Sequence, residues 1–209
     1  MYIPEKFKET RPEMLQPIMR AHPLATLVVA TDGGIVANHI PVMTLAEPQP
    51  LGRLRGHIAR ANSLWKHYRS GSEALAIFHG PDAYVSPNYY PTKQQTGEVV
   101  PTWNYAVVQA RGTLEFTHDA EWLLELVGKL TTVHEAAQPH AWKVDDAPRE
   151  YTRSMLGLIV GFEFTVTGLV GKLKLSQNRN LEDRQGVFEG LNRAGDSDSL
   201  EMAGMMDLK

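Results

Sequence analysis

The chain has 209 residues, of which 43% are hydrophobic and 22% are charged, and its formal net charge is -3. This composition is typical of a globular protein and excludes wholesale disorder. Because the chain has no cysteine, disulfides, thiolate metal sites and thiol catalysis are excluded. The negative charge also excludes a chain-wide basic field that would hold nucleic acid.

The N-terminal residues carry Glu5, Lys6 and Lys8 and show no apolar segment of a signal peptide. No stretch approaches the roughly 20 apolar residues that a membrane span requires. We therefore expect a cytoplasmic protein that has no membrane partner.

The first elements expected along the chain are a helix and a β-hairpin. Thr10 offers an N-cap to a helix whose apolar residues recur at helical spacing. Two β-rich runs, 24–31 and 35–44, then flank Asp32-Gly33-Gly34. Asp-Gly between two such runs predicts a hairpin.

Strands, loops and helices alternate through the rest of the chain. Asp119 is expected to cap a helix with an apolar face of leucine and valine. The polar, proline-containing segment 87–101 is expected to be a functional loop because of its length. Further strands are expected at 54–59, 73–79, 84–86, 103–116 and 158–175, and further helices at 63–68, 147–158 and 180–191.

This order of elements favours an α+β fold, an antiparallel barrel with helices packed at its ends. We expect one domain over residues 1–192. The segment 193–209 is small, polar and tipped with methionine, so it is expected to be a loosely ordered C-terminal tail.

The familiar catalytic signatures are missing from this sequence. There is no Gly-x-Gly-x-x-Gly after a strand, no Walker loop, no His-Glu-x-x-His and no Gly-x-Ser-x-Gly. The eight histidines do not fall at i, i+4 pairs on one helix, so no metal site is predicted. No catalytic residue is assigned, and enzymatic activity stays an open question.

Four segments place polar side chains within β-like or turn-like sequence. They are 37–42, 55–65, 101–105 and 171–179. Cations, amides and aromatics on neighbouring strands can converge on a phosphorylated, planar ligand, and Arg60 at a strand–helix junction suits a phosphate. Each segment also has a structural interpretation: Trp103 as a core residue, Arg60 and Lys172 as solvated strand ends, and Asn38 as the partner of a turn.

Five motifs follow one another along the chain in the order found in a known family. They are Met1-Tyr2-Ile3-Pro4, Ala37-Asn38-His39-Ile40-Pro41, Arg55-Gly56-His57-Ile58-Ala59-Arg60-Ala61-Asn62, Pro101-Thr102-Trp103-Asn104-Tyr105 and Lys172-Leu173-Lys174-Leu175-Ser176-Gln177-Asn178-Arg179. From Met1 to about Leu191 the chain resembles the PaiB-type FMN-binding negative transcriptional regulators.

The resemblance implies a split β-barrel, the fold of the pyridoxamine-phosphate oxidases, in homodimers that hold FMN in clefts at the subunit interface. Arg60 and Asn62 would meet the phosphate of FMN. Trp103 and Asn104 would lie near its ring. The full set of implied cofactor-binding residues is Asn38, His39, Gly56, His57, Arg60, Asn62, Trp103, Asn104, Lys172, Lys174 and Gln177.

The last three of these, Lys172, Lys174 and Gln177, would come from the partner subunit or close the cleft. Tyr90 and Lys93, in a loop particular to this family, are assigned to a lid on the substrate side.

Three functions follow from the resemblance and the fold. The first is a negative transcriptional regulator, for which DNA is a candidate partner. The sequence shows no helix-turn-helix pattern, so duplex binding would need a focused basic face. Its candidates are Arg53, Arg55, Arg60, Lys66 and Arg69. The alternative is an FMN-dependent oxidoreductase or flavin reductase, and a third interpretation is a haem-handling split barrel.

Overall fold

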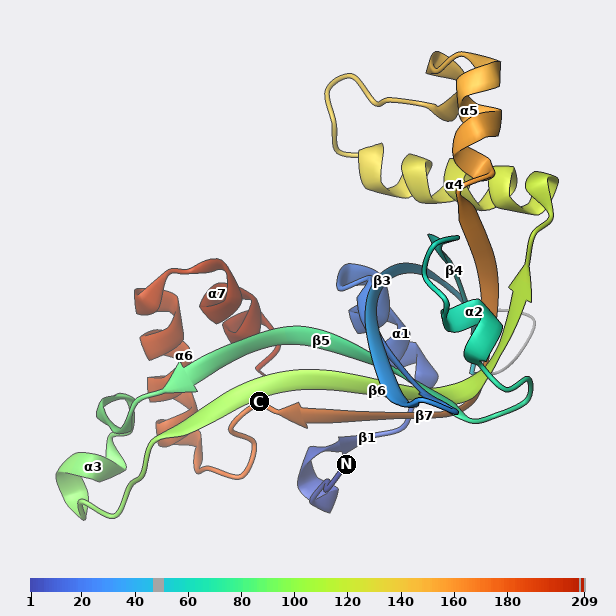
Figure 1. The fold of residues 1–209 in the computed structure, drawn as a ribbon. Helices are drawn as coiled ribbons and strands as arrows, with labels where there is room; N and C mark the ends of the chain where they lie inside the picture. Colours follow the sequence, from blue (N-terminus) through green and yellow to red (C-terminus); the bar gives the residue numbers. More distant parts are fainter. Residues whose placement is uncertain (47–50, 207, 209) are drawn as a thin grey trace. The chain divides into compact units, whose positions relative to one another are not determined.

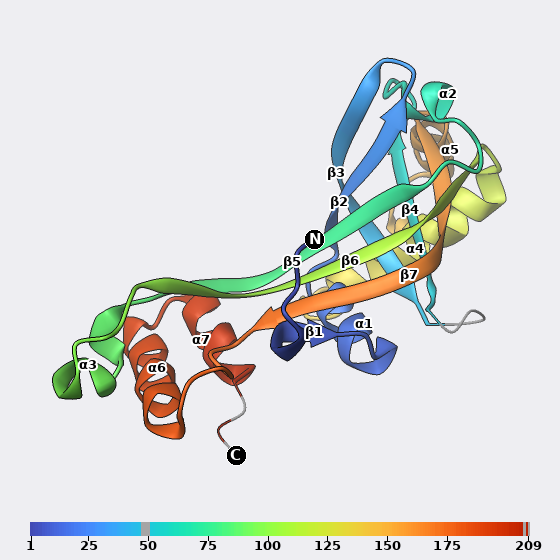
Figure 2. The same cartoon turned by 90° about the horizontal axis from the view of Figure 1, so that it is seen from below.

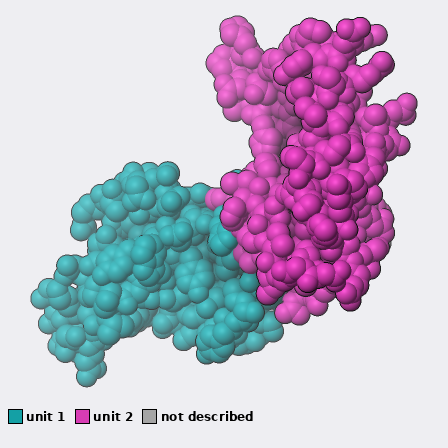
Figure 3. Space-filling model, in the orientation of Figure 1, with its two compact units in different colours: residues 1–21, 79–109, 170–209 teal, residues 22–78, 110–169 magenta. Residues whose placement is uncertain are grey.

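The computed structural model describes residues 1–46, 51–206 and 208, and they form two compact units. The first unit consists of 1–21, 79–109 and the described residues from 170 onward. The second consists of 22–78 and 110–169, without 47–50 (Figure 3). Three long strands, β5, β6 and β7, contribute residues to both units.

The second unit is built around a β-barrel (Figure 2). Six strands follow one another in the order β7-β4-β3-β2-β5-β6, and an additional pairing of β6 with β7 closes the ring. The ladders β2–β3, β2–β5, β3–β4 and β4–β7 are antiparallel. The strands are β2 (Leu24–Thr31), β3 (Gly34–Leu45), β4 (Arg53–Ala59), β5 (Ala74–Val85), β6 (Thr102–Thr117) and β7 (Ile159–Lys174). The antiparallel barrel is therefore confirmed.

The predicted hairpin is confirmed as β2 and β3. Their ladder runs to the pair Thr31–Gly34. Gly34 has φ +112°, a left-handed conformation that favours glycine at this turn.

Alternation along the strands fills the barrel with large apolar side chains. Fully buried examples in this unit are Val29, Leu54, Phe78, Leu114, Phe162 and Phe164. The helices of this unit are α2 (Leu64–His67), α4 (Ala120–Glu135) and α5 (Arg149–Leu156), with the 3-10 turn η3 (Val144–Asp146). The predicted cap of α4 is confirmed, because the Asp119 carboxylate accepts hydrogen bonds from the backbone of Glu121 and Trp122, at 2.8 and 3.0 Å.

The first unit contains the N-terminal helix, the extensions of the long strands and the C-terminal helices (Figure 1). In it the short strand β1 pairs with β7. Its elements are η1 (Glu5–Phe7), β1 (Lys8–Glu9), α1 (Pro12–Ala21), η2 (Pro87–Tyr89), α3 (Thr92–Gln95), α6 (Leu181–Ala194) and α7 (Ser197–Gly204). No helix in the described part of the chain is long and apolar enough to cross a membrane.

Two predicted elements differ from the structure. The expected strands 73–79 and 84–86 form the single strand β5. The segment between them stays extended, and a Cβ on Gly80 would lie 3.2 Å from the Ala106 carbonyl oxygen of β6, so glycine here permits close strand packing.

The C-terminal segment also differs from the expected loose tail. Its middle part forms α7, whose Asp196 cap accepts from the Ser199 backbone at 2.9 Å. Met202, Ala203 and Met206 are buried against α6 and the end of β5. The order comes from these apolar side chains, which recur every three or four residues in a polar sequence. Residues 207 and 209 of the expected tail lie outside the described residues.

Truncating the buried methionine of α7 tests its contribution to the core. We expect Met202→Ala to lower the free energy of unfolding by about 2–5 kcal/mol, because the side chain is fully buried. Leu200→Ala on the same helix, at a side chain that is 46% exposed, is the control and should change it by less than about 0.5 kcal/mol. Urea unfolding measures both, and equal effects would indicate a loosely held segment.

Candidate functional site

A hollow of about 330 Å³ opens in the second unit where strands β3 and β4 separate. Their ladder ends at the pair Val42–Gly56. The next residue of β3 is Pro41, which has no N–H to continue the ladder. Beyond it the two strands pair only with their other neighbours, β2 and β7. The hollow is lined by Asn38, His39, Ile40, Pro41, His57, Ile58, Ala59, Asn62 and Ile159.

The side chain of Asn62 links this hollow to helix α2. Its Nδ2 donates to Asn38 Oδ1 at 2.7 Å, and its Oδ1 accepts from the Leu64 backbone N–H at 3.0 Å. Both asparagines are half-buried. Asn62 therefore fixes the position of the Asn38 amide and occupies its oxygen, while the Asn38 nitrogen stays available.

Two buried polar atoms of the hollow have no hydrogen-bond partner. They are Asn38 Nδ2 and His57 Nδ1. Burial lowers the pKa of His57 below the ordinary imidazole value of 6.5, so the ring is neutral at pH 7. A buried polar atom left unpaired costs about 1–3 kcal/mol, which a ligand that pairs with it would recover.

Two further predicted residues of this unit, His39 and Gly56, make contacts with neighbouring protein groups. His39 is exposed, and its Nδ1 lies 3.0 Å from Thr26 Oγ1. A Cβ on Gly56 would lie 2.6 Å from the Phe162 ring, so glycine is required there for packing.

Arg60 ties the end of β4 to the start of β7. Its Nε donates to the Gly157 carbonyl at 2.6 Å and its Nη2 to the Ile159 carbonyl at 3.0 Å. Its Nη1 lies 3.1 Å from His118 Nδ1. Because a guanidinium only donates, that histidine nitrogen accepts. Three of the five guanidinium N–H groups are thereby used, and the others remain available to an anion.

The predicted residues of the first unit form a separate set of contacts. Asn104 is fully buried and exchanges hydrogen bonds with the Ser176 side chain at 2.9 and 3.1 Å. Lys174 Nζ donates to the Trp103 carbonyl at 2.7 Å. Burial first, and then the nearby charges of other cations, lower the pKa of Lys174. Gln177 donates to the Lys6 carbonyl at 3.1 Å.

Three of the remaining predicted residues of this unit, Trp103, Lys172 and Tyr90, make contacts that involve aromatic rings. Half-exposed Trp103 makes an edge contact with Tyr84, and Lys172 Nζ lies 5.3 Å from the Tyr105 ring centre. Tyr90 belongs to the core of the unit, under the Arg179 guanidinium. This burial differs from the exposed position that a lid requires, whereas Lys93 is exposed and donates to Asn88.

Residues outside the predicted set also shape the hollow. Pro41 ends the β3–β4 ladder, although the family motif over 37–41 gave it no predicted role. His118 and the Gly157 carbonyl fix Arg60, and no signal near either residue indicates that contact. In the described part of the chain, no group of three or more His, Cys, Asp or Glu side chains is arranged to hold a metal ion.

Two carboxylates offset part of the positive charge of the candidate basic face. Arg53 and Arg55 both bind the Glu163 carboxylate, at 2.6 and 2.8 Å, and Arg69 pairs with Asp32 at 3.0 Å. These ion pairs reduce the positive potential that duplex binding would need.

Removing the central carboxylate of this face should lower stability in a pH-dependent way. Burial raises the pKa of Glu163, but the hydrogen bonds and charges of Arg55 and Arg53 outweigh it and lower that pKa overall. Its stabilising effect is therefore present above the ordinary value of 4.5 and is lost as pH falls through the lowered pKa.

We expect Glu163→Gln to reduce the free energy of unfolding by about 2 kcal/mol at pH 7, with the difference from wild type shrinking below pH 4.5. Denaturant titrations over pH measure this. Glu73→Gln, at an exposed carboxylate 3.8 Å from Arg111, is the control and should have little effect. A difference for Glu163→Gln that does not change with pH would contradict the ion-pair explanation.

Comparison with known proteins identifies a family model and relatives that match this chain. A family model described as "Putative FMN-binding domain" matches residues 1–168. Protease synthase and sporulation protein PAI 2 of Bacillus subtilis is 31% identical over 214 residues, covering 100% of this chain and 98% of that protein. An uncharacterised protein of Emericella nidulans is 33% identical over 233 residues, covering 93% of this chain and 92% of its own.

Two solved structures share the fold at low identity. The flavocytochrome Anf3 from Azotobacter vinelandii is 12% identical with a TM-score of 0.61, over 80% of this chain and 69% of that one. The FAD and heme binding protein from Mycobacterium smegmatis is 19% identical with a TM-score of 0.53, over 80% of this chain and 73% of that one. At these identities the likeness establishes the split-barrel fold alone.

Proposed function

Because the chain belongs to the FMN-binding domain family, we propose that it holds FMN in the hollow between β3 and β4. We further propose that it forms a homodimer and acts as a negative transcriptional regulator. The observation that carries the proposal is an unpartnered buried amide nitrogen in the lining of the hollow, Asn38 Nδ2. FMN offers carbonyl oxygens, ring nitrogens and a phosphate, which are partners of the kind this atom lacks.

The residues of the hollow fit the cofactor in chemistry. Asn38 Nδ2 would donate to an acceptor of FMN, and Asn62 would keep that amide in place through the bond of 2.7 Å. Arg60 lies outside the lining but next to Ala59 of it, and would direct its spare N–H groups to the phosphate. Apolar Ile40, Ile58 and Ile159 of the lining would exclude water. When bound, FMN supplies reversible electron and hydride transfer.

The second unit offers only part of the set of residues that the family resemblance implies. Trp103, Asn104, Lys172, Lys174 and Gln177 belong to the first unit. In the proposed homodimer the members of this set that keep exposed surface, Trp103, Lys172, Lys174 and Gln177 of the partner subunit, would complete the cofactor cleft. Asn104 is fully buried and paired with Ser176, so it has a structural role instead.

The proposed regulatory role rests on similarity over the whole chain to PAI 2, a protein whose name refers to protease synthesis and sporulation. The arginines expected to form a DNA-binding face mostly bind carboxylates, as Arg53 and Arg55 bind Glu163. These ion pairs offset part of the positive charge of this face, and the proposed regulation does not depend on duplex binding through it.

A flavin-dependent oxidoreductase is the second candidate, and His57 favours it. Its imidazole is neutral and unpaired in the hollow. A neutral imidazole can accept or hold a proton at Nδ1 near a redox cofactor.

Removing the Asn38 amide tests the proposed cofactor site. We expect Asn38→Ala to weaken FMN binding about tenfold, the equivalent of one lost hydrogen bond of about 1.4 kcal/mol. Asn192→Ala, at an exposed asparagine of α6 that donates to the Phe188 carbonyl, is the matched control and should keep wild-type affinity. Calorimetric titration with FMN measures both, and unchanged affinity of Asn38→Ala would remove this residue from the site.

Anaerobic addition of NADH or NADPH to the FMN-loaded protein separates the two candidate functions. We expect the visible flavin absorption to persist for a regulator, because a regulator needs no reduced nicotinamide. Catalytic bleaching that returns with air over many cycles would contradict a purely regulatory role and establish the oxidoreductase. A haem Soret band in the purified protein would contradict the FMN assignment itself.

A further inference from the structure

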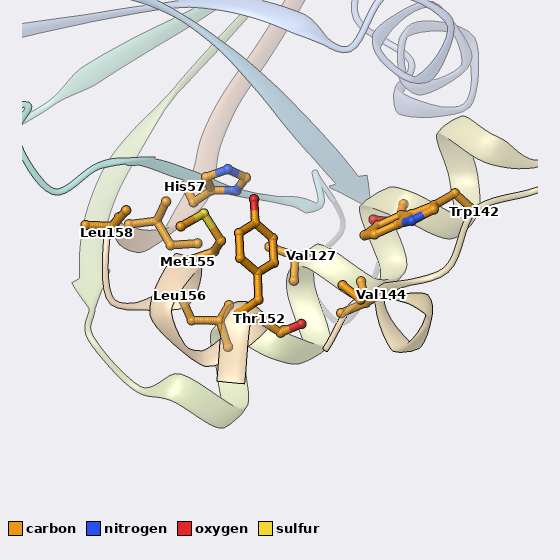
Figure 4. Close-up of a pocket in the computed structure, with 12 residues that line it drawn as sticks. His57, Val127, Trp142, Val144, Thr152, Met155, Leu156 and Leu158 are labelled. Carbon is orange, nitrogen blue, oxygen red and sulfur yellow. The ribbon is translucent and has the colours of Figure 1, made fainter. Parts of the chain in front are cut away.

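A second cavity, of about 300 Å³, lies within the second unit beneath helices α4 and α5 (Figure 4). Helix α4 supplies one wall, α5 another, and the segment around η3 a third, while the ends of β4 and β7 complete it. The lining residues are His57, Val127, Thr131, Trp142, Val144, Ala147, Tyr151, Thr152, Met155, Leu156, Leu158 and Ile159. The volume is that of a small-molecule site.

The walls of this cavity are apolar and incompletely covered. Trp142, Tyr151, Met155 and Leu158 are each more than one-third exposed although they are large and hydrophobic. Figure 4 shows the labelled side chains converging on one space. Four large apolar side chains gathered at the edge of a hollow are typical of a surface that binds an apolar partner. A ligand in the cavity would remove this area from water, which is favourable.

The cavity has one buried polar atom that lacks a partner, His57 Nδ1. No residue of the described lining carries a formal charge at pH 7, since burial lowers the pKa of this histidine and keeps the ring neutral. An ionic ligand would find no counter-charge here and would lose its hydration. An uncharged ligand with a single hydroxyl or carbonyl group would satisfy Nδ1 and leave the rest of its surface to apolar contact.

We propose that this cavity is a binding site for a small, uncharged, mainly apolar molecule with one hydroxyl or carbonyl group, which hydrogen-bonds to His57. The site is distinct from the proposed FMN hollow and does not require FMN to be bound. His57 and Ile159 line both spaces, so a ligand on one side contacts side chains that also border the other.

The probe for this proposal is 2-naphthol, which combines two fused rings with one hydroxyl, compared with naphthalene, which has none. Calorimetric titration of the full chain should show saturable binding of 2-naphthol, about tenfold tighter than naphthalene. His57→Phe should remove that preference while keeping the apolar contacts. Absence of saturable 2-naphthol binding to the wild type would overturn the proposal.

A cavity-filling variant on α4 locates the bound probe. Val127→Trp should weaken 2-naphthol binding at least tenfold, because the indole would occupy the cavity. Val133→Trp, at an exposed position of the same helix, is the matched control and should bind like wild type. Met155→Trp, at a partly exposed wall position, serves in its place if Val127→Trp does not fold by circular dichroism. Equal binding by the cavity variant and the control would overturn the proposal.

FMN titration of the same variants separates the two sites. Loss of 2-naphthol binding with FMN affinity retained in Val127→Trp supports a separate cavity site. A wild type that binds 2-naphthol but not FMN would contradict the proposed function and leave this proposal standing. If the wild type binds no 2-naphthol and Val127→Trp instead changes the oligomeric state, the cavity is a contact between copies and the proposal is wrong.

Discussion

The central constraint on the candidate site is the cost of a buried hydrogen-bonding group that lacks a partner. Such a group costs about 1–3 kcal/mol, yet Asn38 Nδ2 and His57 Nδ1 both line the hollow between β3 and β4. The hollow exists because Pro41 cannot extend the β3–β4 ladder past Val42 and Gly56. A barrel that splits at this point exposes strand edges and side chains that a continuous sheet would cover. The unpaired Asn38 amide nitrogen is therefore a consequence of the split, and a ligand in the split is what would satisfy it.

His57 connects the two spaces of the second unit. It borders the polar hollow on one side and the apolar cavity beneath α4 and α5 on the other. A single neutral imidazole can donate from one nitrogen and accept at the other. Thermodynamic linkage makes any coupling between two ligands of this imidazole reciprocal, which would let the proposed regulator respond to a second molecule.

Much of the fold could be predicted from local sequence, because its signals are local. Asp32-Gly33-Gly34 predicts the turn between β2 and β3, and Asp119 predicts the start of α4. The single strand β5 is not encoded that way, and helix α7 is encoded so only in part, by its Asp196 cap. Gly80 and Pro81 read as an interruption, but close packing against β6 keeps that segment extended. The order of α7 depends on Met202 and Met206 meeting residues far away in the sequence.

For the site, motif resemblance selected Asn38, His57 and Asn62, which the structure brings to one hollow. It could not show that Arg60 is held by the Gly157 and Ile159 carbonyls, because no local pattern encodes those contacts.

The most direct test of the central claim is a crystal structure of the protein grown with FMN. The account predicts FMN between β3 and β4, with one of its acceptor atoms within hydrogen-bond distance of Asn38 Nδ2 and the Asn38–Asn62 bond intact. FMN bound away from this hollow, with Asn38 Nδ2 and His57 Nδ1 still unpaired, would contradict it.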